Sequence, residues 1–398
     1  MRALSLLAIS RGHTVTGSDR TLIGHDEKNI DGADLVVYTN AVGEDNCEVC
    51  AARKRGIPTV ERAAYLGEVS RLYDKTIAVS GCHGKSTTAA MLGVALSDLR
   101  PTVHVGVSGS SHIGGQKYFI TEACEYRKSF LHLSPSLGII LNVGFDHPDC
   151  YKSLDELKEA YRQFAANCKT VLVNGDEDNG INGVTFGFAE GNVYRAVDVK
   201  ADSGKRSFTV LYKHKPLVNV KLNVVGSHNV FNALATIAAA HILGFNVSRA
   251  AQAMSSFGGL PRRFERKGIT LGKTVISDYA HHPDEIRASI AVAKEIFPSV
   301  AVVFQPHTYS RTKALAREFA DALSTADEVI LTPIFAARES DDLGVSSKTI
   351  ADCIIGTNCT CCSVDEAIEK CKSISEKAVI FMGAGDIDGA ADRFLSSG

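Results

Sequence analysis

The stretch Ala78-Val79-Ser80-Gly81-Cys82-His83-Gly84-Lys85-Ser86-Thr87-Thr88 follows an apolar strand that begins at Thr76, and it leads into a helix. A glycine-bounded turn between a strand and a helix directs several backbone N–H groups at one point, and that point favours a polyphosphate. The usual spacing, G-x-x-x-x-G-K-[ST], requires glycine at position 79, where this chain has valine, so the match is to the shorter form G-x-x-G-K-S-T-T. The alternative interpretation is a glycine-capped turn with an exposed lysine.

Under the first interpretation, Lys85 reaches the outer phosphates and the Ser86 hydroxyl holds Mg²⁺. The candidate phosphate-binding residues are Gly81, His83, Gly84, Lys85, Ser86 and Thr87.

The composition is typical of a globular protein with a large core. The chain has 398 residues, of which 45% are hydrophobic and 22% charged, enough for two or three domains. The 43 basic and 45 acidic side chains give a net charge of −2, which predicts no general attraction to nucleic acid or to a membrane. No apolar run approaches the ~18 residues of a membrane span. The 11 cysteines form no regular framework, so we expect a reducing, cytoplasmic location; monomer and homodimer both stay open.

Strands alternate with helices along most of the chain, which predicts an α/β protein with mostly parallel sheets flanked by helices. We divide the chain into three domains, residues 1–73, 74–260 and 261–398. In the first we expect helices at 1–10 and 44–55 and strands at 13–17 and 34–38. In the second we expect strands at 76–79, 118–122, 137–143 and 170–174, a capped helix at 153–167, an antiparallel hairpin at 208–224 and a helix at 229–243. In the third we expect strands at 275–278, 300–304, 329–332 and 379–382, with helices such as 284–296 and 312–323 between them.

Polar side chains follow several predicted strands at their carboxyl ends, where open parallel sheets bind ligands. Glu122 ends one strand of the second domain, and Asp146 and His147 follow the next. Beside Ser86, a carboxylate and an imidazole would make an Mg²⁺ site, although Mg²⁺ usually prefers oxygen ligands. Each residue alone is better explained as a surface or turn side chain, and the phosphate loop is what favours a metal site.

Further polar groups lie later in the chain. Gly226-Ser227-His228-Asn229-x-x-Asn232 opens a helix, where the amides could contact a base or ribose or could cap the helix. Arg262-Arg263-Phe264 follows Pro261, and its guanidinium groups could hold phosphate oxygens or belong to a solvated linker. Three strand ends of the third domain carry Asp278-Tyr279-Ala280-His281-His282-Pro283, Gln305-Pro306-His307-x-Tyr309-x-Arg311 and Gly383-Ala384-Gly385-Asp386. Their common position predicts one pocket rim.

Read in order, and starting at Gly17-Ser18-Asp19, these segments resemble the Mur ligases, ATP-dependent amide-forming enzymes of peptidoglycan synthesis. The resemblance covers nearly the whole chain, and its last three motifs point to the branch of the family that adds alanine. It implies a Rossmann-like domain for the UDP-sugar, a central ATPase domain and a third domain for the amino acid. It also implies that ATP drives the joining of L-alanine to UDP-N-acetylmuramate through an acyl phosphate.

The resemblance implies roles for single residues. The phosphate and metal ligands would be Lys85 for the outer phosphates, Ser86 and Glu122 for one Mg²⁺, and His147 for a second. The other nucleotide contacts would be Asn229 to the adenine, Arg263 near the γ-phosphate and Asp278 to the ribose. The substrate contacts would be Ser18 and Asp19 to the UDP-sugar, and Tyr279, His281, His307 and Arg311 around the amino acid. Lys85, His147, Arg263 and His281 would carry the chemistry, with His281 as the candidate base.

The chain departs from the family pattern in three places. It begins after the first strand and its glycine-rich turn, which we interpret as a misplaced start codon rather than as lost UDP-sugar binding. The acidic run after Glu122 is altered, because residues 123–127 read Ala-Cys-Glu-Tyr-Arg. Thr308 stands where some relatives have arginine, so recognition of the amino-acid carboxylate would depend more on Arg311.

Two other functions stay open at this point. One is a sister ligase that attaches a recycled peptide to the same sugar. The other is a nucleotide-binding pseudoenzyme with a defective sugar domain. A simple phosphate-loop kinase is disfavoured, because it would leave the third domain without a role.

Overall fold

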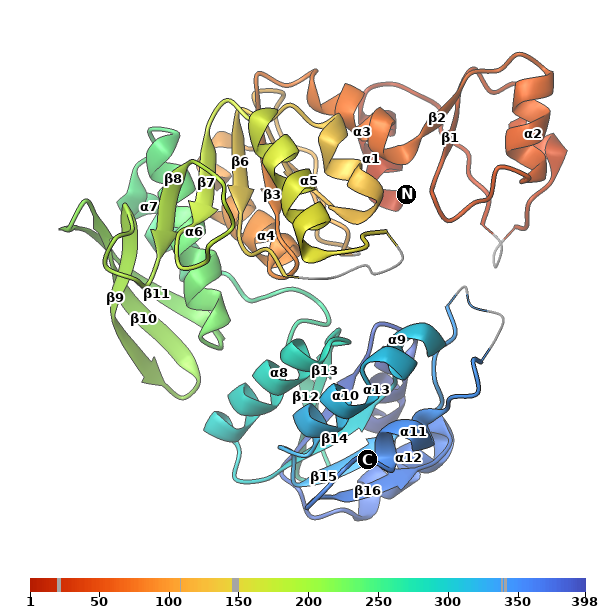
Figure 1. Ribbon diagram of the computed structural model, residues 1–398, viewed down its shortest axis with the longest axis vertical. Helices are drawn as coiled ribbons and strands as arrows, with labels where there is room; N and C mark the ends of the chain where they lie inside the picture. The colour runs from red at the N-terminus through yellow and green to blue at the C-terminus, as the bar shows by residue number, and fades with distance from the viewer. Residues whose placement is uncertain (20–22, 108, 145–149, 338, 340–341) are drawn as a thin grey trace. The chain divides into compact units, whose positions relative to one another are not determined.

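The computed structural model describes residues 1–19, 23–107, 109–144, 150–337, 339 and 342–398 (Figure 1). The chain forms two compact units. The first unit comprises Met1–Val199, Ser207–Lys221 and Val230–Phe257, and the second comprises Lys200–Arg206, Leu222–Asn229 and Gly258–Gly398.

A nine-stranded sheet contains the strand that leads to the phosphate loop. Its strand order is β11-β10-β9-β8-β7-β6-β3-β5-β4, and β3 pairs in parallel with both β5 and β6. The strands are β3 (Lys75–Ser80), β4 (Thr102–His104), β5 (Tyr118–Glu122), β6 (Leu137–Ile140), β7 (Val171–Asn174), β8 (Val184–Gly187), β9 (Tyr194–Asp202), β10 (Lys205–Tyr212) and β11 (Lys215–Val225). β3 is buried from Thr76 onward, which explains its continuous run of apolar and small residues.

Helices cover this sheet. They are α3 (Arg62–Ser70), α4 (Lys85–Ala95), α5 (Leu154–Ala166), α6 (His228–Ile242) and α7 (Val247–Met254), with short 3₁₀ turns η2 (Ser97–Leu99) and η3 (Tyr126–His132). Ser153 caps α5 by accepting a hydrogen bond from Glu156 N, as the sequence predicts. One core cluster joins Phe119 of β5 and Ile140 of β6 to Phe164 of α5, all fully buried. Burying a side chain of that size contributes roughly 2–3 kcal/mol.

The predicted antiparallel hairpin is confirmed. β10 and β11 are joined by Lys213 and His214, a connection short enough only for antiparallel neighbours. Both residues have positive φ, 47° and 64°, as a tight two-residue hairpin turn requires.

The N-terminal region differs from the prediction in which strands it contains. β1 (Val36–Tyr38) and β2 (Thr59–Glu61) form a two-stranded parallel sheet beside α2 (Cys47–Lys54) and the 3₁₀ turn η1 (Glu27–Ile30). The predicted strand at 13–17 is wrong, since these residues are exposed and form no ladder with any strand among the described residues. Helix α1 (Arg2–Ser10) is confirmed, and its Leu4 and Leu7 join the core cluster of the nine-stranded sheet.

A six-stranded sheet forms the body of the second unit, in the order β12-β13-β17-β14-β15-β16. Its elements are β12 (Glu265–Thr270), β13 (Lys273–Asp278), α8 (Pro283–Ile296), β14 (Val300–Phe304), α9 (Tyr309–Ala314), α10 (Ala316–Leu323), β15 (Glu328–Leu331), α11 (Ser347–Ala351), β16 (Asn358–Cys361), α12 (Val364–Ser373), β17 (Ala378–Met382) and α13 (Ile387–Leu395). All neighbouring strands are parallel except β12 and β13. Separate apolar clusters lie under α8 and α10 and under α12 and α13, so both faces are covered.

Two predicted elements differ in extent. The strand predicted at 137–143 ends at Ile140, because the chain from Leu141 onward turns its polar groups to the phosphate loop. The helix predicted at 312–323 is two helices, because Leu315, with φ −120° and ψ 22°, interrupts it and packs against the core. Strands β2, β4, β8, β9, β12 and β16 and helices α3 and α7 were not predicted from the sequence.

Candidate functional site

The phosphate loop connects the end of β3 to the start of α4, as the sequence predicts. Gly81 and Gly84 have φ values of 143° and 85°, which L side chains rarely adopt. A Cβ atom at Gly84 would lie 2.5 Å from Asn232 Oδ1, and one at Gly81 would lie 3.0 Å from Leu141 Cβ. Both the backbone conformation and the close neighbours therefore require glycine.

Helix α4 directs its first-turn amides toward this loop. Gly84 is its N-cap, and no side chain from the described residues caps the helix. First-turn N–H groups have no partner within a helix and carry partial positive charge. Together with the Lys85 ammonium and the Ser86 hydroxyl, this donor set fits the phosphate groups of a nucleotide.

Asn142 clamps the first half of the loop, which the sequence analysis missed. Its side-chain amide accepts a hydrogen bond from His83 N at 2.8 Å and donates one to His83 O at 3.0 Å. Its backbone carbonyl accepts from Cys82 N at 3.3 Å. The loop is thereby fixed from the neighbouring strand β6, and it needs little reorganisation to present its amides.

Lys85 makes a buried ion pair that the sequence analysis also missed. Its Nζ donates to both carboxylate oxygens of Glu125, at 3.0 and 3.1 Å, and to the carbonyls of Gly81 and Cys82. Glu125 is completely buried. Burial alone would lower the pKa of Lys85, but the Glu125 carboxylate outweighs it and raises that pKa, so the ammonium stays charged.

The predicted metal ligands are only partly within the described residues. Glu122 lies opposite Val79 in the β3–β5 register, which places it at the same sheet edge as the phosphate loop. Its Oε1 accepts a hydrogen bond from Gly106 N at 2.6 Å. Asp146 and His147 lie outside the described residues. Within the described part of the chain, no three His, Cys, Asp or Glu side chains group to hold a metal ion.

The residues at the start of α6 have separate roles. Asn229 donates its side-chain amide to Val225 O at 2.7 Å, within the second unit. Burial, reinforced by Arg263, lowers the pKa of His228 to about 4, so this imidazole is neutral. A contact between Asn229 and adenine stays a prediction.

The two arginines after Pro261 are not equivalent. Arg262 donates through Nη2 to Gly383 O at 2.6 Å and to Gly385 O at 2.9 Å, which joins the segment before β12 to the loop after β17. The Arg263 guanidinium lies 5.1 Å from the centre of the Tyr279 ring. A stacked guanidinium keeps its N–H donors in its own plane, where they can meet phosphate oxygens.

Two of the three predicted strand ends, those after β13 and β14, form a row of rings together with Phe335 from the segment after β15. The ring centres of Tyr279 and His281 are 5.2 Å apart, those of His281 and His307 are 6.1 Å apart, and those of His307 and Phe335 are 5.7 Å apart. Phe335 was not among the predicted site residues, because it follows β15 without a recognisable motif. The row forms one wall at the edge where the amino-acid pocket is expected.

His281 is held as a neutral imidazole of known tautomer. Its Nδ1 lies 2.9 Å from Tyr279 O, and a carbonyl only accepts, so Nδ1 carries the proton. Burial lowers the pKa of His281; Glu285 opposes this shift, while Arg311 and Arg263 reinforce it. Nε2 therefore has a lone pair that can accept a proton from a bound group.

Asp278 lies at the end of β13, as predicted, but its carboxylate faces inward. It accepts hydrogen bonds from Ala280 N at 3.1 Å and from the Ser289 hydroxyl. Burial raises its pKa to about 6. The predicted contact between Asp278 and ribose is untested, and it would have to compete with these bonds.

The predicted UDP-sugar residues lie in the N-terminal region. Ser18 donates to Glu48 at 2.7 Å, and Asn29 donates to the same carboxylate at 2.7 Å. Burial alone would raise the pKa of Glu48, but these hydrogen bonds lower it. Ser18 is thus part of a local network around Glu48, and Asp19 follows it at an exposed position.

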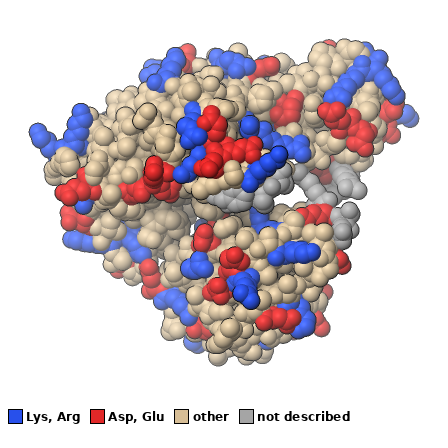
Figure 2. Space-filling model, in the orientation of Figure 1, with Lys and Arg blue, Asp and Glu red and all other residues tan. Residues whose placement is uncertain are grey.

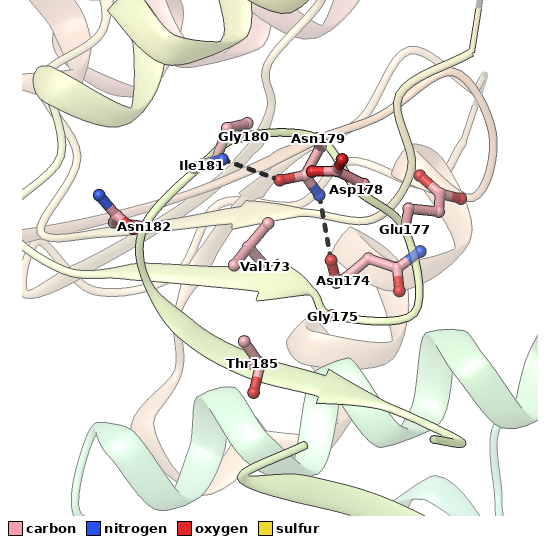
Figure 3. A pocket seen from close by; sticks show the side chains of 10 residues that line it. All are labelled: Val173, Asn174, Gly175, Glu177, Asp178, Asn179, Gly180, Ile181, Asn182 and Thr185. Carbon is pink, nitrogen blue, oxygen red and sulfur yellow. Dashed lines mark hydrogen bonds between the residues drawn. The ribbon is translucent and has the colours of Figure 1, made fainter. Parts of the chain in front are cut away.

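A separate pocket of about 260 Å³ lies at the carboxyl end of β7, along the loop that leads to β8 (Figure 3). The side-chain amide of Asn179 donates to Asn174 O at 3.0 Å, so two of the lining residues are joined. Glu177 accepts from Val143 N at 3.1 Å, and burial raises the pKa of Glu177. The lining residues are Val173, Asn174, Gly175, Glu177, Asp178, Asn179, Gly180, Ile181, Asn182 and Thr185, and none is a predicted site residue.

Basic and acidic side chains are intermixed over the face shown in Figure 2, in keeping with the net charge of −2. No helix among the described residues is long and apolar enough to cross a membrane.

Three family models match consecutive parts of the chain. Residues 1–74 match the model described as Mur ligase family, catalytic domain. Residues 79–240 match the Mur ligase middle domain, and residues 262–385 match Mur ligase, glutamate ligase domain.

Curated relatives align over almost the whole chain. The UDP-N-acetylmuramate–L-alanine ligases of Caldanaerobacter subterraneus and Acetivibrio thermocellus are 39% and 38% identical to it, and each alignment covers 99% of this chain. The chain covers 95% and 93% of these relatives. The first alignment spans 436 positions, more than the 398 residues of this chain, so that relative has residues within the matched region that this chain lacks.

Solved structures show the same similarity. The UDP-N-acetylmuramate–alanine ligase of Thermotoga maritima has a TM-score of 0.86 and 31% identity, with 100% of this chain and 96% of that chain covered. A murein peptide ligase of Psychrobacter arcticus has a TM-score of 0.73 and 25% identity, with the same coverage.

Proposed function

We propose that this chain, which belongs to the Mur ligase family, is an ATP-dependent ligase that joins L-alanine to the carboxylate of UDP-N-acetylmuramate and releases ADP and phosphate. The relatives at 39% and 38% identity bear that function in their names. The lower similarity to the murein peptide ligase, with a TM-score of 0.73 against 0.86, favours alanine over a recycled peptide as the second substrate. The reaction belongs to peptidoglycan synthesis.

We assign the three substrates to three parts of the chain. Residues 1–73, with Ser18 and Asp19, would bind the UDP-sugar. Residues 74–260 would bind ATP through the phosphate loop, with Asn229 toward the adenine. Residues 261–398, with Tyr279, His307 and Arg311, would bind the amino acid.

The first chemical step activates a carboxylate, which is a poor acyl donor. A carboxylate oxygen of the sugar attacks the γ-phosphorus of ATP, ADP leaves, and an acyl phosphate forms. The α4 amides, Lys85 and Arg263 offset the negative charge that spreads over the transferred group. Ser86, Glu122 and His147 are the candidate Mg²⁺ ligands, and bound Mg²⁺ would neutralise further phosphate charge.

The second step forms the amide. The amine of alanine attacks the acyl carbon, and phosphate leaves. The attacking amine must be uncharged, so a base has to remove its proton. His281 suits that role, because its hydrogen bond to Tyr279 O leaves Nε2 as the proton acceptor.

The observation that carries this proposal is the preset phosphate loop with Lys85 at the start of α4. The test supplies ATP, Mg²⁺, UDP-N-acetylmuramate and one amino acid at a time, and measures phosphate release and the amide product. We expect product with L-alanine and little with D-glutamate.

Two results would redirect the proposal. Product only with a tripeptide in place of alanine would assign the chain to the sister peptide ligases. ATP binding without turnover of any acceptor, by protein shown to be folded, would favour the pseudoenzyme.

A further inference from the structure

The Lys85 ammonium has no spare hydrogen-bond donor. It carries three N–H groups, and they face the Gly81 carbonyl, the Cys82 carbonyl at 3.2 Å and the two Glu125 oxygens at 3.0 and 3.1 Å. A phosphate oxygen can therefore bond to Lys85 only if one of these acceptors gives up its donor.

Glu125 cannot follow the lysine when it moves. The Glu125 side chain is completely buried. Its backbone carbonyl accepts hydrogen bonds from the Tyr151 hydroxyl at 2.5 Å and from Lys128 N at 2.8 Å. Tyr151 is 1% exposed and belongs to the core cluster under the nine-stranded sheet. The Glu125 backbone is thus fixed to the core and its side chain is enclosed, so we expect the longer lysine side chain to be the partner that moves.

We propose that Glu125 is a positioning residue that competes with nucleotide phosphate for Lys85 and thereby weakens nucleotide binding. This inference rests on the proposed function, because it requires the loop to bind ATP. A carboxylate is the strongest of the acceptors around the ammonium, since its hydrogen bonds are charge-assisted. The free energy gained when Lys85 binds phosphate is then reduced by the cost of breaking its pair with Glu125. The benefit to turnover would be easier release of ADP.

The test measures the dissociation constant of a non-hydrolysable ATP analogue with Mg²⁺ by calorimetry in four proteins. These are the unaltered chain, Glu125→Gln, Lys85→Met and the double variant. Glutamine keeps the shape of Glu125 but removes its charge, so Glu125→Gln should bind the analogue roughly tenfold more tightly. In the Lys85→Met background there is no ammonium to compete for, so the same change should alter the constant less than twofold.

Steady-state kinetics give a second readout that a purely structural role would not produce. Glu125→Gln should lower KM for ATP without raising kcat, because the change strengthens ground-state binding. Glu125→Asp keeps the charge and should stay nearer to the unaltered chain.

A matched control is available in the second unit. Glu328 is 7% exposed and lies 3.0 Å from Lys370 Nζ, so Glu328→Gln makes the same change in another largely buried Lys–Glu pair. It should leave the dissociation constant unchanged. Thermal unfolding of each variant checks that it is folded.

The outcomes separate the two proposals. If the folded, unaltered chain binds no analogue, the proposed function and this inference both fail. If it binds, but Glu125→Gln binds equally or less tightly, only this inference is overturned. A gain that persists in the Lys85→Met background would also overturn it, because Glu125 would then act on the phosphates directly.

Discussion

Two sheet edges carry predicted site residues, one in each unit, and they hold their cations differently. In the first unit, Lys85 lies against the buried carboxylate of Glu125 and two loop carbonyls. In the second unit, Arg262 and Arg263 lie over the Tyr279 ring, at 4.9 and 5.1 Å from its centre. A cation paired with a carboxylate must exchange partners to bind phosphate, whereas a cation on a ring keeps its in-plane donors.

This difference assigns separate tasks to the two edges. At the first edge, Lys85 is bonded either to Glu125 or to phosphate, because it can bind phosphate only after it gives up a bond to Glu125. At the second edge, Arg263 can bind a negatively charged phosphate directly, because its position over the Tyr279 ring does not use its N–H donors. The predictions that follow test each half of the comparison.

Replacing Lys85 should have the largest effect. Lys85→Ala removes the cation that offsets charge on the transferred phosphoryl group, and we expect turnover to fall by at least roughly 1,000-fold. Phosphate release measures the loss, and circular dichroism should show an intact fold. Turnover within tenfold of normal would contradict the role of Lys85 and make its ion pair with Glu125 purely structural.

The first edge shows which parts of a site can be predicted from sequence. Gly81, Gly84 and Lys85 were identified because their roles depend on adjacent residues and on local backbone geometry. Glu125 and Asn142 were not, because they lie 40 and 59 positions from the loop residues that they contact. Such partners are set by strand order, which a single sequence does not encode locally.

The second edge and the N-terminal region show the same limit. The strand ends of the second unit were predicted, and they do bring Tyr279, His281 and His307 together. The inward turn of Asp278 was not predicted, because it depends on Ser289 of a neighbouring helix. The strand expected at 13–17 was wrong because a short stretch of sequence does not show whether a neighbouring strand is there to pair with it.

Loosening the phosphate loop should have the next largest effect. Asn142→Ala removes both side-chain hydrogen bonds to the part-buried backbone of His83, so the loop is held less firmly. We expect the affinity for an ATP analogue to fall by about 10- to 100-fold, the cost of one or two lost hydrogen bonds. Calorimetry measures it. Asn142→Asp keeps the acceptor for His83 N but adds a negative charge beside the phosphate site, so it should lose at least as much affinity; unchanged affinity in both variants would contradict the role of Asn142.

The two arginines of the second edge should separate stability from catalysis. Arg262→Ala removes the hydrogen bonds to Gly383 O and Gly385 O, and we expect it to destabilise the fold by about 2 kcal/mol. Arg263→Ala should leave stability nearly unchanged and lower kcat instead. Urea unfolding and phosphate release on both variants test this. If both variants lost stability equally, the ring stacking would be structural at both positions.

The smallest effect concerns Asp278 and depends on pH. Its pKa is raised from 3.8 to about 6 by burial, so the folded state binds a proton more readily than the unfolded state. Stability from this group is therefore complete below about pH 4 and falls as pH rises through 6. Asp278→Asn removes the charge, so it should stabilise the protein by about 1 kcal/mol at pH 8 and by less at pH 5.

Urea unfolding of both proteins at pH 5 and pH 8 measures this difference. Asp321→Asn on α10 is the matched control, because Asp321 is exposed. The unfolding free energy of this variant should differ from that of the unaltered chain by a similar amount at pH 5 and pH 8. If Asp278→Asn were destabilising at pH 8, the bonds from Ala280 N and Ser289 would outweigh the burial cost. The second edge would then hold a required anion, as the first edge does with Glu125, and the contrast between the two edges would be weaker.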